Sequence, residues 1–332
     1  MKNPTLKIAA IGGGTGLSTM LKGIKAYTDD ITAVVTAADD GGGSGTLRQD
    51  LGILPPGDIR NCLVALAETE PVMTELFQHR FREGSLAGQT FGNLFLAAMY
   101  GISDGVEEAL QKVGGILRVT GKVLPVTGEN VNISALLENG EEILGESNIG
   151  SAIAHKKSRI LSVSMIPANA PPLPAVIESL EQADIIILGP GSLYTSIVPN
   201  IIVGGVAEAI SASGAMKVYV CNIMSQPGET DGMTAYEHAA AVCRHAKGRI
   251  MDFCIVNGQE IPNTLLEKYI DDGSVPVEIG SPVAELDGVE FIQDSLVSIK
   301  DGLLRHDYDR LAEIIFDMYD YRQRTRKVTM LR

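Results

Sequence analysis

The sequence begins with short apolar runs separated by glycine-rich or polar turns. Leu6–Ile11 is a mainly apolar run of strand length, a glycine-rich loop follows at 12–16, and an amphipathic helix begins near Leu17. Ile31–Ala37 is a second apolar run, rich in β-branched residues, which leads to Asp39-Asp40. Continuous apolar runs of this length are typical of strands buried on both faces. The first forty residues therefore predict a strand–loop–helix–strand unit, the start of a wound parallel sheet.

Beyond this unit the pattern predicts helices, then a β-rich segment, then a return to buried strands. Helices are expected at about 59–68, 71–82, 93–100 and 106–113. Residues 115–126 and 131–145 alternate between apolar and polar positions, with Asn139-Gly140 as a turn between two strand-like arms, which predicts a β-rich insertion or an edge hairpin at about 115–150. Parallel strands are expected at 160–165, 184–188, 218–223 and 253–256, then a last helix at about 308–322 and a basic tail at 322–327.

These elements together predict the fold class. Strands that alternate with helices are typical of α/β proteins with a parallel sheet. We expect one Rossmann-like domain over residues 1–332, with a doubly wound, mainly parallel sheet and the small β-rich insertion. A C-terminal helical segment at about 303–332 completes it. A chain of 332 residues is long enough for such a domain.

Composition and charge narrow the function classes. The formal net charge is −14 and tryptophan is absent, which disfavours nucleic-acid binding. No run of about 18 apolar residues predicts a membrane-spanning helix, and the N-terminus lacks the pattern of a signal peptide. The four cysteines form no CxxC pair, and the five histidines, His155 among them, show no metal-ligand spacing. We expect a soluble cytoplasmic protein with buried free thiols, and a homodimer as the commonest kind of assembly.

The first candidate site is the loop Gly12-Gly13-Gly14-Thr15-Gly16. Glycines between a strand and a helix N-terminus let a ligand approach the backbone, whose N–H groups and helix dipole attract an anion. The glycine spacing departs from the dinucleotide-binding pattern, and the loop lacks the Lys-Ser/Thr of a P-loop. A turn that needs glycine for packing alone is the alternative. Four glycines in five residues favour phosphate binding.

Asp39 and Asp40 form the second candidate site, at the same predicted sheet edge as the glycine loop. In Rossmann proteins an acidic residue at the end of the second strand holds ribose hydroxyls. Two adjacent carboxylates also suit Mg²⁺ or a general base. An ordinary polar turn is the alternative. If the protein uses Mg²⁺, we expect it at Asp39 and Asp40.

Two further polar segments precede predicted helices. Asp58 is expected to cap the helix that starts near Ile59. Arg60 and Asn61 lie in its first turn, where a cation opposes the helix dipole and therefore hints at an anionic partner, either a ligand or an internal carboxylate. Asn93 ends the segment 89–93, which predicts either a helix cap or a second polar wall of the site.

A second glycine-rich loop follows the apolar strand predicted at 185–188. It contributes Gly189, Gly191, Ser192, Tyr194 and Thr195. Ligands in open α/β folds bind at the carboxyl ends of the strands, where this loop is expected. Its glycines and hydroxyls predict a second phosphate or sugar clamp, and Asn222, at the end of the next strand, is a candidate to join it.

Five segments in this order carry a family resemblance. They are IGGGTGLS at 11–18, the Asp-Gly segment at 39–45, PPGDIRN at 55–61, FGN at 91–93 and GPGSLYTSIVPN at 189–200. Over about residues 6–323 the chain resembles the YvcK-like gluconeogenesis factors, which are related to the CofD-like 2-phospho-L-lactate transferases. The resemblance implies a Rossmann-like fold that binds UDP-sugars such as UDP-N-acetylglucosamine, with no firmly attached enzymatic activity. It also implies a role in gluconeogenic growth, cell shape and peptidoglycan synthesis.

The resemblance also implies roles for single residues. Arg305 would contact the nucleotide sugar, and Tyr269 would add an aromatic contact on the same side. In some relatives a threonine regulated by a kinase follows the His-Asp pair, but this chain has Tyr308 there, which puts that regulation in doubt. Gly41–Arg48 lacks the aspartate-rich pattern of the transferase branch, which disfavours the deazaflavin reaction.

Two function hypotheses follow from these features. In the first, the protein is a UDP-sugar sensor with little or no catalysis that acts on cell-envelope synthesis proteins by contact. In the second, it is an enzyme that transfers a phosphorylated group from a nucleotide diphosphate donor with the help of Mg²⁺. An NAD-dependent oxidoreductase is a weaker third hypothesis, because the glycine spacing does not match that class.

Overall fold

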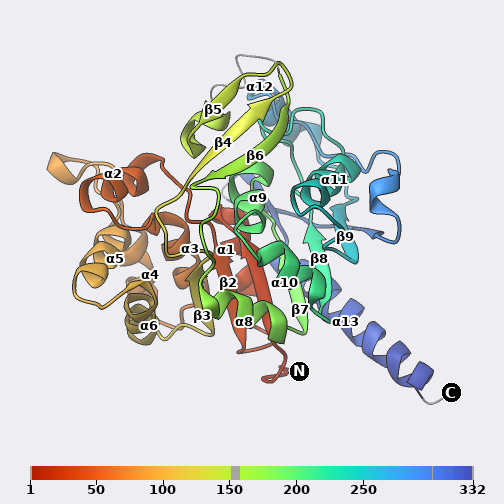
Figure 1. Ribbon diagram of the computed structural model, residues 1–332, viewed down its shortest axis with the longest axis horizontal. Helices are drawn as coiled ribbons and strands as arrows, with labels where there is room; N and C mark the ends of the chain where they lie inside the picture. The colour runs from red at the N-terminus through yellow and green to blue at the C-terminus, as the bar shows by residue number, and fades with distance from the viewer. Residues whose placement is uncertain (1, 151–157, 301, 331–332) are drawn as a thin grey trace.

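The computed structural model describes residues 2–150, 158–300 and 302–330. Its centre is a seven-stranded sheet in the order β10-β9-β8-β7-β1-β2-β3, in which every neighbouring pair is parallel (Figure 1). The strands are β1 (Ile8–Gly12), β2 (Ile31–Val35), β3 (Lys122–Pro125), β7 (Ile185–Leu188), β8 (Met216–Val220), β9 (Phe253–Asn257) and β10 (Glu290–Asp294). The predicted Rossmann-like α/β fold is confirmed.

The central strands are buried on both faces, which explains their continuous apolar sequences. Every residue of β1, β2 and β7 is buried. Successive side chains of a strand point to opposite faces, so Ala9 and Ile11 enter one hydrophobic core while Ile8 and Ala10 enter another. The sheet therefore needs helices on both sides.

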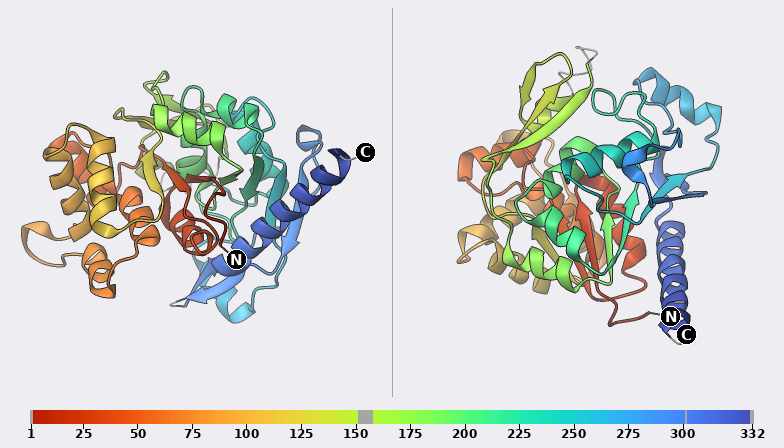
Figure 2. Two further views of the ribbon diagram at one scale, coloured as in Figure 1. Left: turned by 90° about the horizontal axis from the view of Figure 1, so that it is seen from below. Right: turned by 45° about the vertical axis from the view of Figure 1, so that its right-hand side comes forward.

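Helices cover both faces of the sheet (Figures 1 and 2). The core around Ile8 also contains buried residues of α1 (Gly14–Ile24), α3 (Pro56–Leu66) and α13 (Tyr308–Met330). The core around Ile11 lies on the other face of the sheet. The helices that contribute buried residues to it are α8 (Pro174–Gln182), α9 (Val198–Ile201), α10 (Val206–Ala212) and α11 (Ala235–His245).

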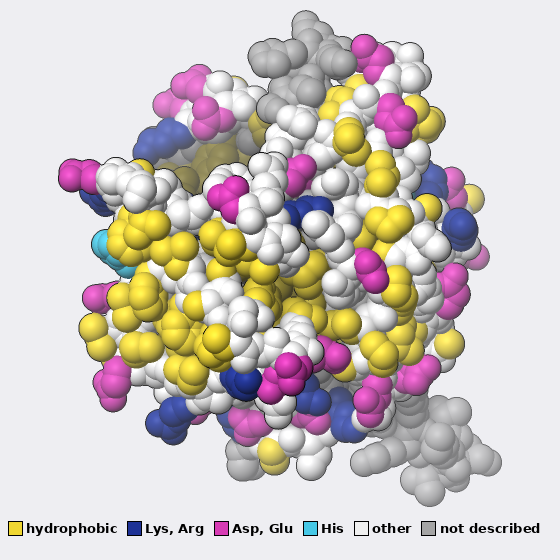
Figure 3. All heavy atoms as spheres, turned by 60° about the vertical axis from the view of Figure 1, so that its left-hand side comes forward, with side chains coloured by type: hydrophobic (Ala, Val, Ile, Leu, Met, Phe, Trp, Pro, Cys, Tyr) yellow, Lys and Arg dark blue, Asp and Glu magenta, His cyan; other side chains and the backbone are white. Residues whose placement is uncertain are grey.

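A helical lobe lies at one side of the sheet, on the left in Figure 1. It consists of α2 (Gly42–Leu51), α4 (Pro71–Gln78), a 3₁₀ turn (Gly84–Leu86), α5 (Phe91–Gly101) and α6 (Val106–Leu117). Figure 3 shows that many hydrophobic side chains gather on this side of the surface. Val72, Leu76 and Ile102 are among the exposed large hydrophobic residues of these elements and their ends.

The structure corrects two strand predictions. β6 (Ile160–Ile166) was expected in the parallel sheet but lies in a separate antiparallel sheet, next to β4 (Asn132–Leu137), with β5 (Glu142–Leu144) on the other side. Exposed and buried residues alternate along β6, which is typical of a strand with one solvated face. The expected insertion at about 115–150 also has different bounds, because α6 reaches Leu117 and β3 is an edge strand of the main sheet.

The C-terminal part brings a small hairpin and a long helix to the sheet. α12 (Asn263–Asp271) and a 3₁₀ turn (Ala284–Leu286) precede the antiparallel pair β11 (Val297–Lys300) and β12 (Leu303–His306). α13 packs closely on α1, because a Cβ added to Gly23 would overlap the Tyr308 carbonyl oxygen. The tail predicted at 322–327 is helical, so the predicted end of this helix was wrong.

Two sequence expectations concern the described part of the chain as a whole. No single helix there has the length and apolar composition to cross a membrane. A bent pair, Leu193–Ile201 with Val206–Ala212, meets that test by length and composition, but these residues contribute to the core beside β7. All four cysteines are buried and free, as predicted.

Candidate functional site

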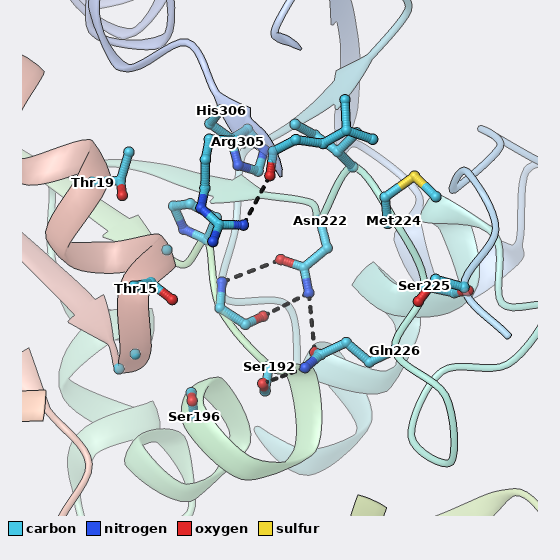
Figure 4. A pocket seen from close by; sticks show the side chains of 18 of the residues that line it. Thr15, Thr19, Ser192, Ser196, Asn222, Met224, Ser225, Gln226, Arg305 and His306 are labelled. Carbon is cyan, nitrogen blue, oxygen red and sulfur yellow. Dashed lines mark hydrogen bonds between the residues drawn. The ribbon is translucent and has the colours of Figure 1, made fainter. Parts of the chain in front are cut away.

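One cavity of about 320 Å³ lies at the carboxyl ends of β1, β7 and β8 (Figure 4). Its lining comes mainly from residues 13–16, 190–192 and 222–226, with Tyr269 and residues 304–306 on another wall. The parallel order of the sheet places these segments together, because β7 lies between β1 and β8. The cavity therefore stands at the sheet edge where ligands of open α/β folds bind.

The first glycine loop turns directly from β1 into α1. Gly14 has a φ of +67°, a conformation that glycine adopts without strain. A Cβ at Gly16 would lie 2.5 Å from the Pro190 carbonyl oxygen, so the two glycine-rich loops touch here. The N–H groups in the first turn of a helix have no partner within the helix, which leaves those of Thr15 and Gly16 at the cavity.

Asn222 holds the second glycine-rich loop in place. Its Oδ1 accepts a hydrogen bond from Gly191 N–H at 3.3 Å, and its Nδ2 donates to the Gly191 carbonyl at 2.8 Å. Gln226 Nε2 donates to Ser192 Oγ at 2.7 Å and continues this network (Figure 4). The Asn222 amide thus binds the loop backbone with both of its polar atoms.

Tyr269 and Arg305 belong to a separate wall formed by α12 and β12. The Tyr269 hydroxyl oxygen accepts a hydrogen bond from Leu304 N–H at 2.7 Å, which ties α12 to β12. Arg305 Nη1 donates to the Leu304 carbonyl at 3.0 Å, and Arg305 forms no ion pair within the described ranges. Its charge is therefore available to an anion in the cavity.

His306 lines the cavity as a neutral side chain. Its Nε2 donates to the Cys221 carbonyl oxygen at 3.2 Å, and burial lowers the pKa of the imidazole to about 4. The sequence predicted structural or exposed histidines, and His155 lies outside the described residues. Arg305 is thus the charged cation among the residues that line this cavity.

The cavity brings together many of the predicted site residues. They are Gly13, Gly14, Thr15, Gly16, Gly191, Ser192, Asn222, Tyr269 and Arg305. Gly12 and Gly189 do not line it and lie where the loops leave β1 and β7. Asn200 Nδ2 donates to the Gly12 carbonyl at 3.0 Å, so that residue supports the loop from behind.

Tyr194 and Thr195 are buried away from this cavity. Both belong to η2 (Leu193–Ile197), a π-helical turn that follows the second loop. The Tyr194 hydroxyl contacts Met233 Sδ at 4.0 Å, and Thr195 Oγ1 donates to Glu229 Oε1 at 3.4 Å. The structure therefore does not bring these two predicted site residues to the cavity lining.

Asp39 and Asp40 also lie outside the cavity lining. Asp39 Oδ1 accepts from Gly41 N–H at 2.9 Å, and Asp40 Oδ1 accepts from Ser147 N–H at 2.8 Å. Burial raises the pKa of the Asp39 carboxyl. Among the residues that the structure describes, no group of three or more His, Cys, Asp or Glu side chains is arranged to hold a metal ion.

Arg60 joins α3 to α5 and does not line the cavity. Its Nη1 donates to Asn93 Oδ1 at 2.7 Å and to Thr90 Oγ1, and its Nη2 donates to Asn61 Oδ1 at 2.8 Å. Thr90 caps α5, as the segment 89–93 allowed. The arginine in the first turn of α3 therefore has neutral oxygen partners rather than a carboxylate.

Asp58 was predicted to cap α3, and that prediction is wrong. Pro55 is the N-cap residue, and no side chain caps this helix. Asp58 instead accepts a hydrogen bond from Gly14 N–H in the first glycine loop. Burial raises the pKa of its carboxyl to about 6. The proline turn in the sequence predicts that Asp58 lies at the start of α3. It does not predict which other element the side chain contacts.

Glu146 and Glu229 are two partly buried glutamates whose carboxyl pKa values are also raised. Burial, with nearby carboxylates as a second cause, raises the pKa of Glu146 to about 8. Burial raises the pKa of Glu229 to about 7. Sequence reasoning did not single out either residue, nor Gln226, although the segment 222–229 follows a strand at the carboxyl edge.

Comparisons with known proteins identify the family and the fold of this chain. The family model of 2-phospho-L-lactate transferase CofD matches residues 8–297. A relative from Clostridium acetobutylicum is 50% identical over 311 residues, which cover 94% of this chain and 69% of the relative. The gluconeogenesis factor of Bacillus subtilis is 44% identical over 313 residues, which cover 94% of this chain and 98% of that protein. A UPF0052 family crystal structure from Bacillus halodurans has a TM-score of 0.90 and 42% identity, and covers 94% of this chain and 100% of that chain.

Proposed function

This chain belongs to the family of CofD-like gluconeogenesis factors, and we propose that it binds a UDP-sugar, such as UDP-N-acetylglucosamine, in the cavity at the carboxyl edge. One observation carries the proposal: the N-terminus of α1 and the side chain of Arg305 line the same cavity. A helix N-terminus and a guanidinium group both bind phosphate oxygens. A diphosphate between them would be neutralised from two sides.

The remaining lining suits a polar ligand attached to that diphosphate. The hydroxyl groups of Thr15, Ser192 and Ser196 line the cavity, and Tyr269 adds an aromatic ring. The volume of about 320 Å³ lies within the usual range of small-ligand pockets. We assign the diphosphate to the Thr15–Gly16 backbone with Arg305 on its other side, and the sugar to the wall of Tyr269 and Arg305.

We further propose that binding is regulatory rather than catalytic. Among the described residues that line the cavity, none pairs a serine or cysteine with a histidine or carboxylate base at hydrogen-bond distance. Relatives carry the name gluconeogenesis factor. In this proposal the UDP-sugar complex contacts cytoplasmic cell-envelope synthesis proteins and adjusts growth on gluconeogenic carbon, cell shape and peptidoglycan synthesis.

Calorimetry with UDP-N-acetylglucosamine tests the proposal. The wild-type protein should bind the ligand, and Arg305→Ala should weaken affinity by about 10- to 100-fold, the usual worth of a hydrogen-bonded charge. Arg82→Ala is the matched control, because Arg82 is an exposed arginine of the helical lobe and should leave affinity unchanged. Undetectable binding of the wild-type protein at millimolar ligand would contradict the proposal.

A second candidate is the transfer of a phosphorylated group from a nucleotide diphosphate donor. The match to the family model of 2-phospho-L-lactate transferase favours it, and so do the buried carboxyls beside the first glycine loop. Turnover of such a donor that requires Mg²⁺ and stops when EDTA is added would support this candidate. Unchanged donor after long incubation with Mg²⁺ and acceptor alcohols would support the regulatory role.

A further inference from the structure

The Asp58 carboxyl group lies directly against the first glycine loop. A Cβ added to Gly13 would lie 2.5 Å from Asp58 Oδ2, and Gly14 N–H donates a hydrogen bond to this carboxyl group. Thr15 and Gly16, the next two residues, line the cavity with Gly13 and Gly14. The Asp58 carboxyl group therefore binds one peptide group of this loop, and an anion in the cavity would bind the peptide groups next to it.

The surroundings of Asp58 do not pair its carboxylate with a cation. In the described part of the chain it forms no ion pair, and the hydrogen bonds of Arg60 run to neutral oxygens of α3 and α5. Asp39, which follows β2, adds a second negative charge on another side. The charge of Asp58 also raises the pKa of two other groups, which are Glu146, beside the antiparallel sheet, and the buried Cys62 thiol of α3.

A phosphate group on this loop would meet that buried charge at short range. Two like charges on adjacent peptide groups repel strongly where water is excluded. A proton on the carboxyl group removes the repulsion and leaves the hydrogen bond from Gly14 N–H possible. We propose that the first glycine loop binds its phosphate ligand together with one proton, which Asp58 holds.

The proposal rests on the proposed function for the identity of the ligand, and the electrostatics of Asp58 support it. Burial, the largest cause, and Asp39 raise the pKa of this carboxyl to about 6, while Gly14 N–H and Arg60 act in the opposite direction. A bound phosphate raises the pKa further. Above pH 6 the free protein has therefore lost a proton that the complex holds, so affinity falls as pH rises.

The test measures proton uptake by calorimetry with UDP-N-acetylglucosamine, in buffers of different ionisation enthalpy between pH 6 and pH 8. This ligand is a diphosphate diester that does not itself titrate in this range. The wild-type protein should take up close to one proton per ligand near pH 7.5. Its affinity should fall by up to about tenfold per pH unit above pH 6.

Asp58→Asn is the decisive variant, because asparagine keeps the shape and the acceptor for Gly14 N–H but carries no charge. It should take up little or no proton and bind with a nearly constant affinity, tighter than the wild type at pH 8. Glu146→Gln is the matched control, since it removes another buried carboxyl with a raised pKa that does not bind the loop. It should retain the proton uptake.

The outcomes separate this inference from the proposed function. Binding of UDP-N-acetylglucosamine without proton uptake, or uptake that persists in Asp58→Asn, overturns the inference and leaves the proposed function intact. If that ligand does not bind, inorganic sulfate serves as a second probe, because it is an anion that does not titrate here. Sulfate should then cause proton uptake in the unbuffered wild-type protein and not in Asp58→Asn, and a lack of uptake also overturns the inference.

Discussion

Single residues set how closely the two glycine-rich loops approach each other. Gly16 faces the Pro190 carbonyl, and Gly191 faces the Gly13 carbonyl oxygen, which a Cβ at Gly191 would meet at 3.2 Å. No larger side chain fits at Gly16 without moving the Pro190 backbone. The two loops can therefore form the floor of the cavity because Gly16 has no Cβ, and not only because glycine tolerates a positive φ.

Gly16→Ala should therefore separate the loops. We expect at least a tenfold loss of UDP-sugar affinity and a lower melting temperature, because the added Cβ would lie 2.5 Å from a carbonyl oxygen. Gly115→Ala in α6 is the control, since nothing lies within 4 Å of its added Cβ, and it should gain up to about 1 kcal/mol of stability. Equal affinities in the wild type and Gly16→Ala, measured by calorimetry, would refute this account of the loops.

Glu146 predicts a pH dependence of stability. The pKa of its carboxyl is raised from 4.5 to about 8, so the folded protein holds a proton that the unfolded chain loses between these values. This contribution is present at pH 4.5 and is lost as pH rises toward 8.

Glu146→Gln should therefore match the wild type near pH 4.5 and exceed its free energy of unfolding by about 1–3 kcal/mol at pH 8, less than the full pKa shift would give because solvent screens this partly buried side chain. Urea titrations at both pH values measure the difference. Glu138→Gln changes an exposed glutamate just after β4 and should differ little from the wild type at either pH. If the free energies of unfolding of Glu146→Gln and the wild type differ by the same amount at both pH values, the pKa of Glu146 is not raised in the folded protein.

The position of the glycine loops could be predicted from the sequence, because a run of glycines directly after an apolar strand indicates a turn at the carboxyl edge of the sheet. Tyr194 and Thr195 were predicted to join them, since all of these residues are close in the sequence. The π-helical turn directs those two side chains into the core, and nothing in their residue types indicates it. Asp58 was misassigned for a similar reason: its partner, Gly14, lies on another element.

At the scale of elements, hydrogen bonds from a residue at the end of β8 hold the loop that follows the neighbouring strand, β7. Asn222 follows β8, and its amide holds Gly191 on the loop after β7. The same amide Nδ2 approaches Gln226 Oε1 at 3.5 Å. The second loop therefore takes its position from β8 as well as from β7.

Asn222→Ala should loosen the second loop without removing the phosphate donors of α1. The loss of two hydrogen bonds to one loop residue predicts a destabilisation of about 1–3 kcal/mol. Ligand affinity should fall by about tenfold, less than in Arg305→Ala. Thermal unfolding with and without UDP-N-acetylglucosamine measures both effects, and an unaltered melting temperature would show that the network contributes little.

The wrong prediction for β6 shows which strands can be placed in a sheet from their pattern of apolar and polar residues. The buried runs of β1, β2 and β7 predicted parallel strands correctly, because only strands covered on both faces are apolar throughout. β6 alternates, and its partner β4 was predicted as part of a hairpin. β3 is short, and its four residues do not reveal which sheet they join.

At the scale of the whole molecule, α13 is both a covering helix and a projecting one. Its first half packs on α1, and Phe316 stacks on Tyr27, just after α1, with ring centroids 4.1 Å apart. Arg322 Nη1 lies 2.6 Å from Asp252 Oδ2, and beyond this pair the helix leaves the body (Figure 2). The start of this helix was predicted correctly from the sequence, and its end was placed too early.

A chain that ends at Thr325 should therefore keep its fold. We expect a melting temperature within about 2 °C of the full chain and unchanged ligand affinity, because the backbone of α13 has left the body before this point (Figure 2). Arg322→Ala, by contrast, should cost about 1 kcal/mol, since it breaks a partly buried ion pair. Scanning calorimetry compares the three proteins, and a large loss from the truncation would place an essential contact beyond Thr325.

The cavity draws on both halves of the chain, and this has a consequence for its synthesis. β1 pairs directly with β7, so Ile8 finds its neighbour at Ile185, and the wall that carries Arg305 is translated later still. A ribosome-bound chain that has not yet released residue 306 has no complete binding site. Under the proposed function, the ability to bind the nucleotide sugar therefore arises only after residue 306 has left the ribosome, and the ligand then selectively stabilises molecules that have finished folding.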